Sequence, residues 1–239
     1  MQRIISTFIS RGIISLLLLF SFASNGMAQE KEVAAKADST ELFQSITVGY
    51  DLVGAGMLLF SDYGHHEIFA RANLKNKYFP VVEVGLGRAS HDDDVTGIHY
   101  DTSAPYFRIG CDMNLLRDKQ ADHKVFAGAR YAFTSFKANI SSADFIDPIW
   151  QTPVSYNIDG EKCSQHWLEL ALGIDTKIYG PVHLGWSVRY RHRIAHNEGP
   201  GGKVWYIPGY GVSDSSVITA TFNVSVLLDR SLWKRKSAN

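Results

Sequence analysis

The sequence has only two cysteines, no excess of either charge, and no apolar run long enough for a permanent membrane helix. With 24 basic and 24 acidic residues, it offers no electrostatic case for a nucleic-acid partner. Its longest apolar run, residues 12–22, falls short of the roughly 20 residues that a membrane helix needs. No phosphate-binding glycine loop, CxxC pair or HExxH motif occurs. The sequence therefore predicts no cofactor and no bound metal.

The N-terminus has the three parts of an export signal. Two arginines, Arg3 and Arg11, precede the apolar run, and Gly26 and Ala28 supply the small residues that precede a cleavage site. We therefore predict that residues 1–28 are removed and that the mature chain begins at Gln29. No cysteine stands at the cleavage site after the run, so a lipoprotein anchor is not expected. Without the two arginines, 22 basic residues face 24 acidic ones, a net charge of −2.

Between residues 44 and 229, an alternation of apolar and polar residues restarts eight times. Behind an export signal, this pattern predicts an all-β, closed, antiparallel up-and-down transmembrane barrel, with lipid outside and polar residues inside. Among β-structures only a closed barrel leaves no backbone group unpaired in lipid. The predicted strands cover residues 44–60, 67–74, 79–89, 105–116, 124–136, 166–178, 182–193 and 216–228.

The lengths of the connections agree with a barrel that starts in the periplasm. Connections 75–78, 117–123 and 179–181 are short, whereas 90–104, 137–165 and 194–215 are long and belong outside the cell. Only the first outer connection, 61–66, is brief. A ten-stranded barrel stays open, because residues 138–149 and 152–158 could hold another hairpin. Flanking the barrel (44–229), residues 29–43 are expected to form a flexible periplasmic lead-in and residues 230–239 a basic periplasmic tail.

The inward-facing rows carry charges of both signs. The basic members are Arg71, Arg108, Arg130, Arg189 and Arg191, and the acidic members are Asp51, Glu67, Glu83, Asp112, Glu169 and Asp175. Since buried charges are costly unless paired, we predict an ionic plug made of Glu83, Arg108, Asp112, Arg130, Glu169, Arg189 and Arg191. A conducting pathway is the alternative, but five arginines in so narrow a tube would rather close it.

One constellation has the residue types of an acyl hydrolase. His166, His192, Asp214 and Ser216 share the outward parity at the predicted outer rim, and a serine, a histidine and a carboxylate could act together on lipid. The competing interpretation is that polar residues simply mark where each strand meets the headgroups. The sequence cannot decide between them, because such triads are recognised by geometry.

Other candidates are weaker. The run 91–94 (HDDD) could collect calcium but has no spaced loop around it, so a solvated charge run is preferred. The pair His65 and His66 has no third ligand at metal spacing and is expected to be exposed. Cys111 falls on a lipid-facing position and Cys163 in a long loop, which leaves a disulfide open.

The expected partners are outer-membrane lipids, the barrel assembly machinery during biogenesis, and an extracellular ligand bound by loops 90–104, 137–165 and 194–215. These loops carry aromatic residues of the kind that make contacts, namely Tyr100, Trp150, Tyr156, Trp205, Tyr206 and Tyr210. A non-enzymatic protein of the cell outer membrane is the preferred hypothesis. A soluble ligand-binding barrel is the other alternative, and it would need an apolar interior and a polar exterior.

Several runs resemble a known family. They read HWLELALGI at 166–174, LGWSVR at 184–189 and YIPGYG at 206–211, with YFRIGCDMNL at 106–115 and ARYAF at 129–133 earlier in the chain. In this order they are similar to domain of unknown function 6048, small outer-membrane barrels of Bacteroidota. The resemblance implies an exported barrel without an established activity or catalytic residues. The chain departs from barrels that end on an aromatic residue, because its last strand ends VLL before a basic tail.

Overall fold

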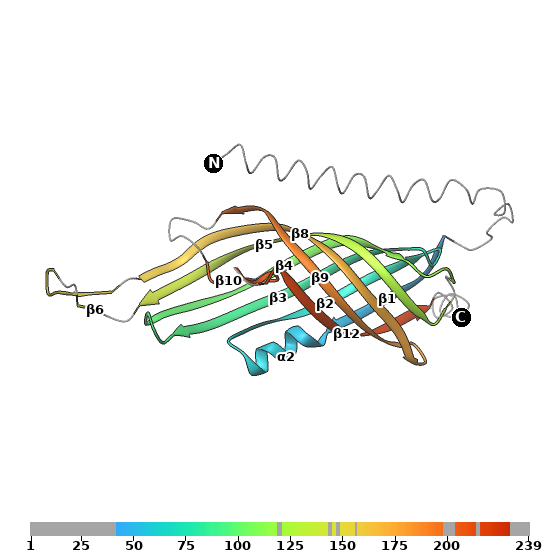
Figure 1. Cartoon of the computed structure of the whole chain (residues 1–239), viewed down its shortest axis with the longest axis horizontal. Helices are drawn as coiled ribbons and strands as arrows, with labels where there is room; N and C mark the ends of the chain where they lie inside the picture. Colours follow the sequence, from blue (N-terminus) through green and yellow to red (C-terminus); the bar gives the residue numbers. More distant parts are fainter. Residues whose placement is uncertain are drawn as a thin grey trace, which may run out of the picture. The chain divides into compact units, whose positions relative to one another are not determined.

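The computed structural model describes residues 42–118, 121–142, 145–146, 149–155, 157–197, 204–213 and 216–229. Eight strands in the described chain close into a barrel in the order β1-β12-β9-β8-β5-β4-β3-β2, with each neighbouring pair antiparallel (Figure 1). They are β1 (Phe43–Asp51), β2 (Tyr63–Leu74), β3 (Tyr78–Asp93), β4 (Ile98–Asn114), β5 (His123–Ser142), β8 (Asn157–Tyr179), β9 (Val182–Asn197) and β12 (Ile218–Asp229). The predicted fold class is confirmed.

The alternation of the sequence becomes an apolar exterior and a polar interior. On β8, Leu168, Leu170 and Leu172 are 47%, 55% and 63% exposed, whereas Trp167 and Glu169, which alternate with them, are buried. Successive residues of a strand point to opposite faces, so each strand contributes one apolar row and one polar row. The outward rows form an apolar belt around the barrel. Within the described residues, no helix is long and apolar enough to cross a bilayer.

The extra hairpin within residues 137–165 does not join the barrel. β6 (Phe145–Ile146) and β7 (Pro153–Val154) pair only with each other, so eight strands, not ten, close the wall. Much of the two regions predicted as loops 90–104 and 137–165 is strand instead. β3 and β4 pair as far as Asp93 and Ile98, and β5 and β8 pair as far as Ser141 and Asn157. Figure 1 shows these strands reaching far beyond β1 and β12 at one end.

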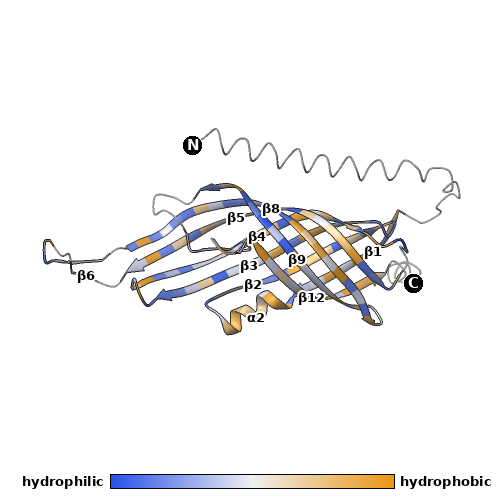
Figure 2. Cartoon of the chain, viewed as in Figure 1, coloured by the Kyte–Doolittle hydropathy of each residue, from blue (hydrophilic) through white to orange (hydrophobic). Residues whose placement is uncertain are grey.

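The first predicted strand, 44–60, is wrong in its second half. β1 ends at Asp51, and the helix α2 (Leu52–Phe60) follows. The Asp51 carboxylate accepts hydrogen bonds from the backbone N–H groups of Val53 (3.3 Å) and Gly54 (2.9 Å), which caps the first turn of the helix. Figure 2 shows that α2 is apolar along its length, and Phe60 at its end is 90% exposed.

The helix α2 lies where β1 would otherwise have continued. The last pairs of β1 are Asp51 with Asn223 of β12 and Tyr50 with Ile68 of β2. Residues 218–222 and 63–67 therefore run past the end of β1, and α2 contacts both of their strands. Gly64 allows this packing, because a Cβ there would lie 2.6 Å from the backbone nitrogen of Leu58. Beyond the end of β1, α2 thus takes the place of that strand between β12 and β2.

Candidate functional site

Charged side chains fill the middle of the barrel, with Glu83 of β3 at their centre. Its carboxylate lies 2.8 Å from Arg130 Nε, 2.8 Å from Arg189 Nη1 and 3.2 Å from Arg108 Nη1. The strand register brings these groups together, because Glu83 lies directly opposite Arg108 in the β3–β4 pair. All four side chains are buried, so each charge is neutralised within the protein rather than by water.

Glu169 of β8 is the second centre of this cluster. Its Oε1 lies 3.0 Å from Arg108 Nε and 3.1 Å from Arg191 Nε, and its Oε2 lies 3.5 Å from Arg189 Nη1. Glu169 is paired in register with Arg191 of β9 on one side and with Arg130 of β5 on the other. The arginines therefore bridge two carboxylates that lie on separate strands of the wall.

Two aromatic side chains donate hydrogen bonds to the cluster. Tyr106 OH donates to Glu67 Oε2 (2.6 Å), which also accepts a bond from Arg108, and Trp167 Nε1 donates to Glu169 Oε1 (2.7 Å). Both rings are fully buried. The alternation places Tyr106 and Trp167 on the inward face, but it carries no signal that their polar atoms complete the carboxylate shells.

A second charged layer lies nearer the end with the short turns. Asp112 takes two contacts from Arg130, each at 3.1 Å, and a third from Arg71 at 3.2 Å. Arg71 also lies 3.8 Å from Asp175, which is hydrogen-bonded to His183 Nδ1 at 2.8 Å. All seven residues of the predicted plug therefore lie buried in the lumen, each with at least one oppositely charged neighbour.

Residues 204–213 fold into the mouth of the barrel above these charges. This segment holds the two-residue strands β10 (Tyr206–Ile207) and β11 (Gly211–Val212), which pair with each other. Arg108 Nη2 donates to the carbonyl of Gly209 (2.6 Å), and Arg191 donates to that of Tyr210. Gly209 has φ +82°, and a Cβ there would lie 2.4 Å from the Tyr106 ring, so the tight approach of the segment requires glycine.

The aromatic residues predicted to offer contacts on the loops mostly point inward. Tyr100, Tyr206 and Tyr210 are buried, and Trp205 stacks on His91 with ring centroids 4.2 Å apart. Burial raises the pKa of the Tyr206 phenol, which stays protonated and donates to the carbonyl of Gly64 (3.0 Å). Trp150 is 75% exposed, whereas Tyr156 lies outside the described residues. The contact hypothesis is wrong for the three buried tyrosines.

A recess of about 390 Å³ opens beside α2, where the wall changes from strand to helix. Met57 of α2, His65 of β2, Arg191 of β9 and Ser216 line it. His65 Nε2 lies 3.1 Å from Asp51 Oδ2, and its ring meets the Tyr106 ring edge-on. The prediction that His65 is exposed is therefore wrong, because its imidazole faces inward and contacts the buried Asp51 carboxylate.

The hydrolase constellation is not assembled among the described residues. His166 Nδ1 is hydrogen-bonded to Tyr131 OH at 2.7 Å, and the whole strand β9 separates its strand from β12. His192 is exposed on β9, and Ser216 lies against Gly211 in the recess beside α2. Asp214 lies outside the described residues. No described hydrogen bond joins Ser216 to either histidine, so the geometry gives this alternative no support.

The structure also supports neither the possible disulfide nor the possible calcium site. Cys111 faces outward and Cys163 is buried in β8 rather than placed in a loop, and no disulfide joins them. His91 lies 2.8 Å from Asp62, and Asp92 lies 2.6 Å from His99. Across the described part of the chain, no group of three or more histidine, cysteine, aspartate and glutamate side chains could hold a metal ion.

A family model described as "Domain of unknown function (DUF6048)" matches residues 9–229. No curated protein matches the chain. Among solved structures, it is similar to Neisserial surface protein A, with 14% identity over 77% of this chain and 95% of that one and a TM-score of 0.38. A major outer membrane protein from Thermus thermophilus shares 12% identity over 78% and 99% of the two chains, with a TM-score of 0.43. Ail, the attachment invasion locus protein of Yersinia pestis, shares 12% identity over 79% and 96%, with a TM-score of 0.34.

Proposed function

The chain belongs to the domain of unknown function family DUF6048, and we propose that it is a closed, non-conducting barrel of the outer membrane whose long strands project from the cell. The observation that carries this proposal is the combination of an apolar outer belt with an ion-paired lumen. Lipid stabilises such an exterior, whereas water would not. The proposed role is structural or one of interaction, and no residue is assigned to catalysis.

The lengths of the strands support projection beyond the membrane. A tilted transmembrane strand needs about 9–11 residues, whereas β5 has 20 and β8 has 23. The outward residues of β5 change from Tyr131 and Phe133 to Ser135, Lys137 and Asn139. This change from apolar to polar supports a border of the hydrocarbon between Phe133 and Ser135. The β3–β4 and β5–β8 hairpins would then present a polar surface to partners outside the cell.

The filling of the lumen supports a closed barrel. An eight-stranded barrel is just wide enough for its own side chains, and here ion-paired arginines and glutamates occupy that space. Residues 204–213 cover the mouth above them. Together the two layers support a closed lumen, so transport is not the proposed role.

Electrical recording tests the proposal directly. The protein reconstituted into planar lipid bilayers is expected to show no stepwise conductance, while a porin inserted in the same way gives clear steps. Steps that depend on this protein would contradict the closed lumen. Failure of the folded protein to enter liposomes at all, together with recovery from water without detergent, would contradict the membrane placement.

The proposal includes export with removal of residues 1–28. The apolar run and the small residues Gly26 and Ala28 support cleavage after Ala28. Mass spectrometry of the protein extracted from outer membranes is expected to give a chain that begins at Gln29. Residues 29–42, ahead of β1, and the tail 230–239 would then lie on the periplasmic side. A chain that retains its first 28 residues would show that the run acts as an anchor.

A further inference from the structure

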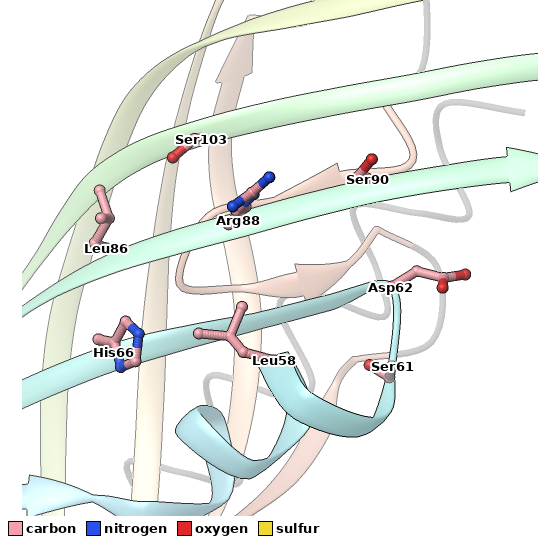
Figure 3. A pocket seen from close by; sticks show the side chains of 8 residues that line it. All are labelled: Leu58, Ser61, Asp62, His66, Leu86, Arg88, Ser90 and Ser103. Atoms are coloured by element: carbon pink, nitrogen blue, oxygen red, sulfur yellow. The ribbon is translucent and has the colours of Figure 1, made fainter.

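A groove on the outer surface of the barrel lies beside the end of α2, with a volume of about 610 Å³. Figure 3 shows its lining: Leu58 from α2, Ser61 and Asp62 from the turn that follows it, His66 from β2, Leu86, Arg88 and Ser90 from β3, and Ser103 from β4. In the register, Arg88 lies between Gly64 of β2 and Ser103 of β4. Since neither neighbour has a large side chain, the guanidinium has open space around it.

The groove lies at the level where the apolar belt ends. The outward residues of β3 run Val82, Val84 and Leu86, which are 44–50% exposed, and then change to Arg88 and Ser90. Leu58 and Leu86 therefore form an apolar side of the groove, and Arg88 with Ser90 and Ser103 forms a polar side. In a barrel that sits in lipid, this change of polarity marks the headgroup level, where arginine side chains are favoured.

Arg88 differs from the arginines of the lumen in having no carboxylate partner among the described residues. Each of Arg71, Arg108, Arg130, Arg189 and Arg191 is within 4 Å of an acidic oxygen, but no such pair includes Arg88. The acid that also lines the groove, Asp62, is hydrogen-bonded to His91, and Figure 3 shows its carboxylate pointing away from Arg88. The groove thus offers one uncompensated positive charge.

We propose that this groove binds the phosphate group of a phosphorylated lipid of the outer leaflet, with Arg88 as the anion ligand. The inference rests on the proposed membrane placement. A guanidinium can hold two phosphate oxygens through parallel hydrogen bonds, and the Ser90 and Ser103 hydroxyls are further donors at the same level. Leu58 and Leu86 would contact the acyl chains. This apolar side distinguishes a lipid from free phosphate, which has nothing to place there.

The test measures which lipids the folded protein retains. The full barrel is reconstituted into phosphatidylcholine nanodiscs that contain phosphatidic acid, released, and weighed by native mass spectrometry. The parent protein is expected to retain phosphatidic acid in preference to phosphatidylcholine. Arg88→Ala is expected to reduce this retention about tenfold, and Arg88→Lys to reduce it less, because lysine keeps the charge but loses the bidentate geometry.

Lys162→Ala is the matched control, since it removes one positive charge from an exposed, outward-facing position on β8 away from the groove. It is expected to retain phosphatidic acid as the parent does. Equal retention by Arg88→Ala and the parent would overturn the site. Displacement of the lipid by inorganic phosphate at comparable concentration would assign the groove to a free anion and overturn the lipid source. Failure of the parent to insert into nanodiscs would instead contradict the membrane placement.

Discussion

Replacement of Glu83 by alanine is expected to lower the free energy of unfolding by about 3–5 kcal/mol, the usual cost of removing one partner from a buried ion pair. The Glu83 carboxylate lies within 3.2 Å of Arg108, Arg130 and Arg189. Its loss would leave three buried guanidinium groups that share the remaining carboxylates. Urea unfolding in phospholipid vesicles, followed by tryptophan fluorescence, measures the effect, and urea is uncharged and does not screen the ion pairs.

Two variants calibrate this result. Asp159→Ala removes an exposed acidic side chain from β8 and is expected to change the free energy of unfolding by less than about 0.5 kcal/mol. Combining Glu83→Ala with Arg130→Ala is expected to cost less than the sum of the two single changes, because the pair is removed together. If Glu83→Ala unfolds within 0.5 kcal/mol of the parent, roughly the range of a surface substitution, the lumen is hydrated and the ionic network does not stabilise the barrel.

For the strand segments at the level of the apolar belt, the sequence alone predicts which residues face outward and which face the lumen. Period-two alternation assigns a face without any knowledge of tertiary contacts, and Glu169 is buried between Leu168 and Leu170 as that rule requires. The register then follows from the pairing of adjacent strands, which brings Glu169 opposite Arg191. For this reason the charged members of the lumen could be identified before their partners were known.

The true length of the strands could not be predicted in the same way, because the pattern inverts above the belt. There the inward residues are apolar, such as Tyr100, Phe136 and Cys163, and the outward ones are polar, such as Lys137 and Lys162. A prediction that requires apolar residues on the outside therefore assigns these parts of the strands to loops. Buried apolar residues form a hydrophobic core between these strands, as expected where water rather than lipid surrounds them in the proposed placement.

Neither the helix α2 nor the position of residues 204–213 in the mouth of the barrel could be predicted from the local sequence. Residues 52–60 (LVGAGMLLF) are almost uniformly apolar, so their periodicity cannot distinguish a buried strand from a helix. The one local signal was Asp51, which can cap a helix. Tyr206 and Tyr210 are buried because Arg108, Arg191 and Gly64 hold the segment from strands far away in the sequence.

Replacement of Leu172 by arginine tests which face of the wall meets lipid. Leu172 lies near the middle of the apolar row of β8, 63% exposed, and is paired with Ala127 and Val188. Arginine on the lipid face costs about 2–4 kcal/mol at the midplane of the bilayer. We therefore expect the free energy of unfolding in vesicles to fall by this amount. In a water-soluble barrel the same change would be a surface substitution, with an effect of about 0.5 kcal/mol or less.

Ser164→Arg supplies the control on the same strand and the same face. Ser164 lies above the belt, paired with Ser135 of β5 and Asn197 of β9, so an arginine there would be in water or among headgroups. Its expected cost is about 0–1 kcal/mol, as for sites near the interface. A steep difference between positions 172 and 164 would reveal the depth profile of a bilayer along β8. Equal and small effects would mean that the apolar belt faces water, and the membrane placement would fail with it.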